Sequence, residues 1–171
     1  CSSDLYSYKY GSTFSASTEL QTQIAGWYAS GTEVVFACGG SMFQSVLSAA
    51  SEYENAKIIG VDVDQSAESS KVITSAMKGL SASVERILGQ FYEGKWDSEL
   101  ADKAQNLGAA EGATGLPEDT WSMKNFTVEQ YKALFKKVAD GEIVPDSKTP
   151  DDANNADWLK GIPNVTIDFE A

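Results

Sequence analysis

Residues 58–78 read IIGVDVDQSAESSKVITSAMK, and this stretch decides the fold. Its opening run, IIGV, is short and β-branched enough to form a strand buried on both faces. The strand ends in acid, because Asp62 and Asp64 follow it with Gln65 beside them. In open α/β sheets, ligands bind in the crevice outside the carboxyl ends of the strands. We therefore expect this polar cluster to bind a small molecule.

The same stretch ends in a cation, Lys78. A carboxylate accepts hydrogen bonds and an ammonium donates them, so Asp62 and Lys78 could together hold neighbouring hydroxyl groups. Both could equally be ordinary solvated charges, which is the usual state of Asp and Lys side chains.

Composition bounds the class of protein. The chain has 171 residues, 42% of them hydrophobic and 22% charged, as in a single globular domain with its own core. The net charge of −12 argues against nucleic acid or an anionic membrane as a partner, because phosphates are bound by Lys and Arg. The sequence has no histidine, which excludes Ser-His-Asp and Cys-His catalysis and histidine-ligated metals.

Strand and helix patterns alternate along the chain. This order predicts one α/β domain over residues 1–171, with a Rossmann-like parallel sheet, flanking helices and right-handed crossovers. Neither GxGxxG nor a P-loop motif is present. Strands are expected at residues 5–10, 33–38, 58–62, 113–116 and 165–169, and helices at residues 19–29, 42–52, 75–91 and 127–139.

Two glycines, Gly39 and Gly40, separate the second strand from the second helix. They could let backbone N–H groups approach a ligand, or they could simply make a tight turn. Cys38, just before them, is expected to be a buried structural thiol, because no histidine is present to activate it. Cys1, followed by Ser-Ser-Asp, resembles the first residue of a mature bacterial lipoprotein. It could equally be the point at which a longer chain was cut.

The order of these motifs resembles the basic membrane protein family. The resemblance covers residues 8–145 and lies in GTEVVFACGG, IGVDVDQ, SAMK, a Gly-Lys-Trp segment and DGEIVP. That family comprises substrate-binding lipoproteins of ABC transporters for purine and other nucleosides, with the two α/β lobes of a type I periplasmic-binding-protein fold. A complete member is about twice this long. The resemblance implies that this chain is the second lobe, with the first lobe absent.

The resemblance also implies roles for individual residues. Asp62 would accept hydrogen bonds from ribose hydroxyls, and Lys78 would donate to the same sugar. Gly39 and Gly40 would bring the backbone near the ligand. The aromatic contact expected after the glycines falls best on Phe43, although a core position for this ring is equally compatible with the helix pattern.

Two further residues match the motif. Asp64 and Gln65 would belong to the ligand site, or would only shape the turn at the strand end, as Asx side chains do. Trp121 lies in a loop that could approach the cleft, with a packing role favoured.

The resemblance implies that the protein is the substrate-binding component of an ABC transporter that captures nucleosides, with no catalytic residues, cofactor or metal. Its partners would be the transporter permease and a small ligand, which the resemblance implies is a purine nucleoside. Its location would be extracytoplasmic, on the bacterial cell membrane through a lipid anchor. Two alternatives stay open: a ligand-sensing domain of a signalling protein, and a nucleoside- or glycoside-processing enzyme that uses the paired carboxylates.

Overall fold

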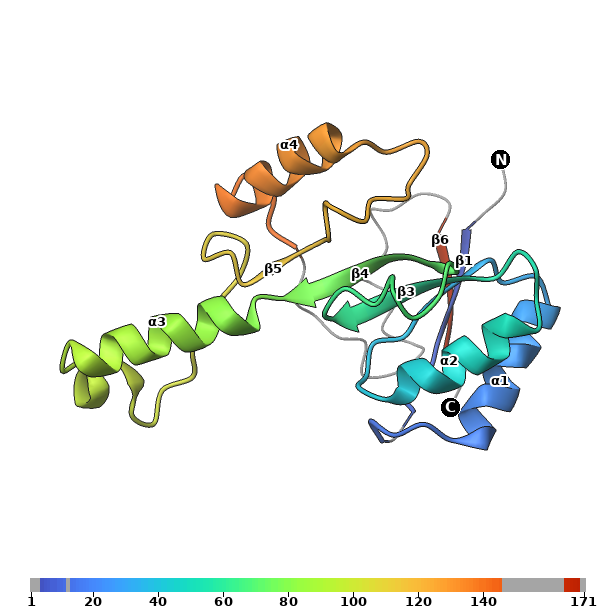
Figure 1. Cartoon of the computed structure of the whole chain (residues 1–171), viewed down its shortest axis with the longest axis horizontal. Coiled ribbons are helices and arrows are strands. Elements are labelled where there is room, and N and C mark those ends of the chain that lie inside the picture. The colour runs from blue at the N-terminus through green and yellow to red at the C-terminus, as the bar shows by residue number, and fades with distance from the viewer. Residues whose placement is uncertain (1–3, 12, 146–164, 170–171) are drawn as a thin grey trace. The chain divides into compact units, whose positions relative to one another are not determined.

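The computed structural model describes residues 4–11, 13–145 and 165–169. The chain divides into two compact units. One unit is formed by the two ends of the chain, Cys1–Thr13 and Pro145–Ala171, and the other by Phe14–Val144. Figure 1 shows the elements of both, and each unit is described here by itself.

The unit formed by the chain ends contains a two-stranded parallel sheet. Strand β1 (Asp4–Tyr8) pairs with strand β6 (Val165–Phe169), and Asp4 lies opposite Val165. Both strands were expected from the sequence, and the structure confirms them. The ring of Tyr8 meets that of Tyr10 edge to face at 4.9 Å between centroids.

The larger unit is built on a four-stranded sheet. Its first three strands run parallel, as their Val- and Ile-rich sequences predict, and a short fourth strand pairs antiparallel at the edge. The short strand lies just before Pro117, inside the residues 113–116 that the sequence indicated. The strands, in spatial order, are β2 (Val34–Phe36), β3 (Lys57–Asp62), β4 (Val72–Lys78) and β5 (Thr114–Gly115).

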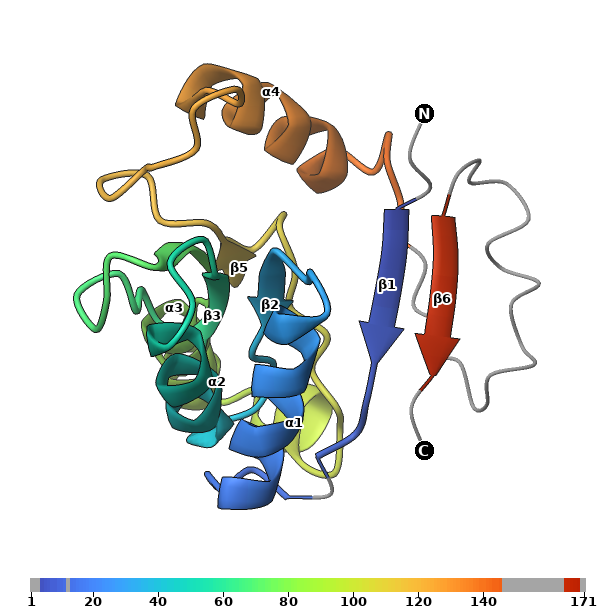
Figure 2. The same ribbon diagram turned by 90° about the vertical axis from the view of Figure 1, so that its right-hand side faces the viewer.

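Helices α1 (Thr18–Ala29) and α2 (Met42–Ser51) lie side by side on one side of this sheet (Figure 2). Ser17 caps α1 by accepting a hydrogen bond from the Leu20 N–H at 3.1 Å. Between these helices and the strands lies the hydrophobic core. Its buried members are Ile24, Tyr28, Val35, Ala37, Phe43, Val46, Ala49, Ala50, Ala56, Ile58 and Val72.

Helix α4 (Val128–Ala139) lies on the other side of the sheet from α1 and α2 in Figures 1 and 2. It begins with a full capping box, because Thr127 accepts from the Gln130 N–H and the Gln130 side chain accepts from the Thr127 N–H. The predicted start of this helix is confirmed. Tyr131, its buried residue, accepts a hydrogen bond from the Leu116 N–H at 2.9 Å and so fixes α4 beside β5.

Helix α3 (Leu80–Tyr92) and the π-helical turn η1 (Trp96–Leu100) leave the end of β4 and extend away from the sheet (Figure 1). The expectation of a helix starting at residue 75 was wrong, since residues 72–78 form strand β4. Val72, Ile73 and Thr74 are β-branched and therefore favour a strand. None of the residues of α3 is buried.

The fold class is α/β, with a sheet that is mainly parallel and flanked by helices, as predicted. Within the described ranges, none of the helices combines the length and the apolar character needed to span a bilayer.

Candidate functional site

The predicted pair of charges comes together at the carboxyl edge of the sheet. Asp62 ends β3 and lies opposite Met77 in the ladder, so Lys78 projects one residue further along β4. The Lys78 Nζ lies 2.6 Å from Asp62 Oδ1. The Lys78 side chain is 63% exposed and that of Asp62 is 37% exposed, so the pair faces solvent where a ligand could reach it.

Asp62 holds an uncommon backbone conformation, with φ of 69° in the left-handed region. This region disfavours residues other than glycine by roughly 1–2 kcal/mol, although Asp and Asn adopt it more readily than most. Its Oδ1 atom is buried and, among the described residues, accepts no hydrogen bond from a hydroxyl or backbone N–H, so the Lys78 ammonium is its partner. The strand end thus holds the carboxylate against Lys78.

The electrostatics of the pair favour a charged lysine. The hydrogen bond from Lys78 to Asp62, and then the charge of Asp62, raise the pKa of Lys78 above its ordinary value of 10.5. The ammonium is therefore charged throughout the neutral range.

Cys38 is exposed, so the expectation of a buried thiol was wrong. Strand β2 ends at Phe36, two residues earlier than the sequence indicated, and Cys38 lies in the connection beyond it. Its neighbour Ala37 is buried and its N–H still donates to Ile59 O at 3.0 Å. The thiol therefore lies at the same edge of the sheet as the Asp62–Lys78 pair.

The glycines Gly39 and Gly40 form a turn packed against the protein's own residues. A side chain at Gly39 would lie 2.6 Å from Met42 Sδ, and one at Gly40, where φ is +45°, would lie 3.1 Å from Phe14 O. The Ser41 hydroxyl also donates to Phe14 O, at 3.1 Å. The close approach that requires glycine here is thus to the Phe14 segment.

Phe14 was not singled out from the sequence, where it lies in a loop of small residues. Its ring is 76% exposed beside the glycine turn. An aromatic ring open to solvent at the carboxyl edge of a sheet can stack on a flat ligand. A lone aromatic between Ser, Thr and Gly residues is the only signal in the sequence that could have drawn attention to it.

Asp64 and Gln65 hold the strand-end loop. Asp64 Oδ1 accepts from the Ser66 N–H at 3.0 Å, an Asx turn, and Oδ2 accepts from the Thr120 hydroxyl at 2.7 Å. Desolvation raises the Asp64 pKa, but these hydrogen bonds outweigh it and hold that pKa below its ordinary value of 3.8. Gln65 Oε1 accepts from the Val61 N–H at 2.9 Å. Both side chains use their polar atoms within the protein.

The other two aromatic residues singled out from the sequence pack within the protein. Phe43 is 1% exposed in the core, which is the alternative that the helix pattern left open. The Trp121 indole N–H donates to Phe126 O at 2.7 Å, and its ring packs against Tyr131 at 5.4 Å between centroids. Trp121 therefore has a local packing role beside α4.

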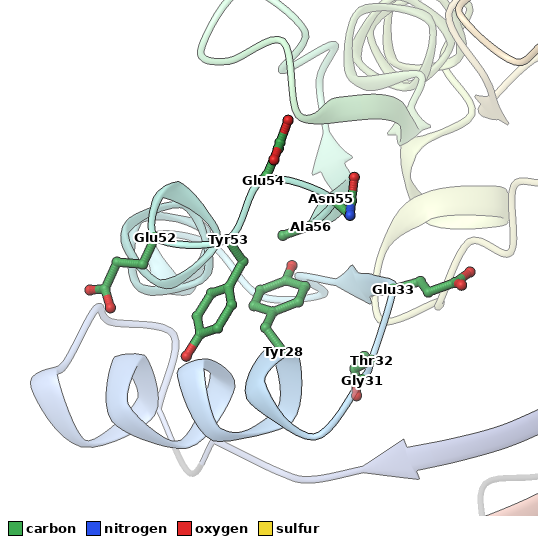
Figure 3. A pocket seen from close by; sticks show the side chains of 9 residues that line it. All are labelled: Tyr28, Gly31, Thr32, Glu33, Glu52, Tyr53, Glu54, Asn55 and Ala56. Atoms are coloured by element: carbon green, nitrogen blue, oxygen red, sulfur yellow. The ribbon is translucent and has the colours of Figure 1, made fainter.

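A cavity of about 430 Å³ lies at the opposite edge of the sheet, before the amino ends of β2 and β3 (Figure 3). Its polar groups do not converge, since the side chains of Glu33 and Glu52 point away from each other in Figure 3. The Tyr28 hydroxyl there donates to Lys57 O at 2.9 Å. This cavity thus lacks the converging polar groups that fix a ligand.

Among the residues that the structure describes, no group of three or more His, Cys, Asp or Glu side chains is placed to hold a metal ion. The chemistry available at the carboxyl edge is therefore that of one ion pair, a thiol and an aromatic ring, which suits recognition of a small hydroxylated molecule.

Comparison with known proteins identifies the family and the fold. Residues 6–148 match the family described as ABC transporter substrate-binding protein PnrA-like, or Bmp. No curated protein matches the chain. The structure is similar to a crystal structure of ABC transporter system solute-binding proteins from Aeropyrum pernix K1, with a TM-score of 0.56 and 20% identity over 82% of this chain. The chain spans about half of that relative, 47% of its length. With its sequence matched from β1 to beyond α4, the chain belongs to the Bmp family of PnrA-like ABC transporter substrate-binding proteins.

Proposed function

We propose that this chain is the second lobe of a two-lobed receptor that captures nucleosides for an ABC permease. The observation that carries the proposal is the Asp62–Lys78 pair at 2.6 Å on the carboxyl edge of the sheet. A ribose diol needs both acceptors and donors, and a hydroxyl left unsatisfied on burial would cost about 1–3 kcal/mol. A carboxylate and an ammonium side by side supply them.

The surroundings favour a neutral ligand with a flat ring over a phosphate. The carboxylate neutralises the ammonium at the edge, and the net charge of −12 repels anions. The exposed Phe14 ring provides an apolar face for a nucleobase. Gly39 and Gly40 keep the turn backbone close to Phe14. The proposed ligand contacts are therefore Asp62, Lys78 and Phe14. Asp64 and Gln65 hold the loop at the end of the strand.

The proposal extends to the place where the receptor works. Family membership favours an extracytoplasmic receptor that delivers its ligand to a permease. Anchoring through a lipid on Cys1 is part of this proposal, and Cys1 lies outside the described residues. Binding without chemistry is favoured because the Asp62 carboxylate is engaged with Lys78, and both carboxylate oxygens of Asp64 accept hydrogen bonds within the protein.

A thermal-shift series tests the proposal. The protein is heated with purine nucleosides, pyrimidine nucleosides, free bases, ribose and nucleoside monophosphates, each in separate samples. A ligand at a hundredfold excess over its Kd stabilises the folded state by about 2.7 kcal/mol. We expect shifts with nucleosides and none with ribose alone or with monophosphates. Chromatography of the recovered ligand is the control, because release of free base would instead support the hydrolase alternative.

A further inference from the structure

Asp62 lies at the centre of a three-residue turn. The Val63 N–H donates to Val61 O at 2.8 Å, and Asp62 between them has φ of 69°. A hydrogen bond that spans three residues around a positive φ defines the rarer and more strained form of the γ-turn. Such a conformation persists only where the surrounding structure holds it. The residues that hold this turn therefore determine where the Asp62 carboxylate lies.

Gln65 holds the turn at its entry. Its Oε1 atom accepts from the Val61 N–H at 2.9 Å, and Val61 is the first residue of the turn. The side chain thus reaches back from the loop to the strand β3. Gly60 makes room for it, because a side chain at position 60 would lie 2.5 Å from Gln65 Oε1 and 2.7 Å from Ser75 Oγ. The contact of Gln65 and Ser75 with the β3 backbone therefore requires a glycine at position 60.

Ser75 anchors Gln65 to the neighbouring strand. Its Oγ atom accepts from the Gln65 N–H at 3.0 Å. Ser75 is fully buried and lies opposite Gly60 in the ladder between β3 and β4. Strand β4 ends at Lys78, three residues later. Through Gln65, hydrogen bonds thus connect the strand that carries Asp62 with the strand that carries Lys78.

A direct ligand contact through Gln65 is the alternative that the sequence left open. Its amide oxygen is already bonded to the Val61 N–H, and its backbone N–H to Ser75. The side chains of Asp62 and Lys78, in contrast, are 37% and 63% exposed. A ligand can therefore reach the charge pair directly, whereas Gln65 acts on it through the backbone of the turn.

We propose that Gln65 and Ser75 are positioning residues of the ligand site, which hold the Asp62 turn so that its carboxylate meets Lys78. This inference rests on the proposed nucleoside-binding function and adds the residues that set the geometry of the charge pair. Without the bond to the Val61 N–H, the turn relaxes to a less strained conformation and the carboxylate leaves Lys78. The acceptor and the donor then no longer face the same pair of hydroxyl groups.

The test uses matched replacements of two glutamines in the 171-residue protein. Gln65→Met and Gln130→Met each remove an Oε1 atom that accepts from a backbone N–H at 2.9 Å, the first at the turn and the second at the start of α4. The readout is 15N NMR of the lysine ammonium groups, whose protons exchange with water more slowly when they are hydrogen-bonded. Gln65→Met should speed the exchange at Lys78 several-fold, and Gln130→Met should leave it unchanged. The ammonium of Lys95, 2.9 Å from Glu93 Oε2, is the internal reference.

A double-mutant cycle separates positioning from contact. Calorimetric titrations with adenosine and with uridine are made for Gln65→Met, for Asp62→Gly and for the double variant. Gln65→Met alone should raise Kd about tenfold or more. In the Asp62→Gly background the carboxylate is already absent, so Gln65→Met should raise Kd by less than about twofold.

Equal rises in Kd in the two backgrounds would overturn the proposal, because Gln65 would then contact the ligand itself. Unchanged exchange at Lys78 in Gln65→Met would overturn it as well. If Gln65→Met does not fold, Ser75→Ala removes the other hydrogen bond of Gln65 and should give the same order of effects. Absence of binding by either nucleoside would reject the proposed ligand, while the exchange rates at Lys78 still decide the role of Gln65.

Discussion

The Nζ atom of Lys78 lies 2.6 Å from Oδ1 of Asp62, although each residue ends a different strand. Exposed ion pairs contribute only about 0–1 kcal/mol to stability. At the same time, the left-handed conformation of Asp62 costs roughly 1–2 kcal/mol. The Asp62–Lys78 pair therefore adds little to the stability of the fold. A site arranged for ligand binding is expected to have this property, because function and stability often conflict.

Two replacements of Asp62 separate its backbone from its carboxylate. Asp62→Gly fits φ of 69° and should change the free energy of unfolding by no more than about 1 kcal/mol. Asp62→Val places a β-branched residue there and should cost on the order of 1–3 kcal/mol. Both remove the acceptor, so both should weaken nucleoside binding tenfold or more. Urea unfolding and calorimetric titration measure the two effects, and retained affinity in Asp62→Gly would remove Asp62 from the site.

The Asp64 carboxylate should make part of the stability depend on acid pH. Its pKa is lowered in the folded protein, so the unfolded chain binds the proton more readily. The stabilisation is therefore complete above the unfolded value, near 3.8, and is lost as pH falls through the lower folded value. Asp64→Asn should be less stable than the unmutated protein at pH 7, and the difference should shrink below pH of about 4. Thr120→Val, which removes one hydrogen bond to Asp64, should reproduce part of the loss at pH 7.

The buried hydroxyl of Ser75 should matter more than its size suggests. Ser75 is fully buried, and its Oγ accepts from the Gln65 N–H at 3.0 Å. Ser75→Ala leaves that N–H without a partner and should cost about 1–3 kcal/mol in denaturant unfolding. Ser122→Ala is the matched control, because Ser122 is exposed and donates to Ile73 O, which water can satisfy instead. Equal effects of the two variants would mean that the strand-end loop is not held by Ser75.

The Cys38 thiol should react readily in the native protein, since its side chain is exposed. We expect alkylation by iodoacetamide at a rate close to that of a free cysteine, with peptide mapping to separate Cys38 from Cys1. A Cys38→Ser, Ala50→Cys variant provides the control, because position 50 is fully buried and should label slowly. Bound nucleoside should slow the reaction of Cys38, because Cys38 follows β2 at the same edge of the sheet as the Asp62–Lys78 pair. Unchanged labelling at saturating nucleoside would place the ligand elsewhere.

Local signals explain what could be predicted from the sequence. The strand through Val61 carries a β-branched run, and the acidic pair that follows it marks its end. The start of α4 is encoded within four residues, Thr127 to Gln130. The side chains of Thr127 and Gln130 each accept a hydrogen bond from the backbone N–H of the other. Asp62 and Lys78 were paired from the sequence as a carboxylate at a strand end and a lysine one element later. The structure brings them together for a reason the sequence analysis did not have, because each residue ends one of two adjacent parallel strands.

Tertiary packing explains what could not be predicted. The sequence Ser75-Ala76-Met77 suits a helix as well as a strand, and its pairing with β3 decides between them. Helical periodicity identified Phe43 as an aromatic on α2, but only the packing of α1 against α2 buries its ring. Phe14, in a loop, has no periodicity, so its position beside Gly40 emerges only from the folded chain.

The parallel pairing of β1 with β6 bears on how the chain can be engineered. Asp4 and its partner Val165 are 161 positions apart (165 − 4), so this pair closes nearly the whole chain and is expected to form late in folding. Removing either strand would leave the other without its partner. A circular permutant would need a linker from Phe169 back to Asp4, and because the strands run in the same direction it must retrace about 13 Å. A tag or fusion partner at either end would therefore be attached next to a sheet edge that depends on both ends of the polypeptide.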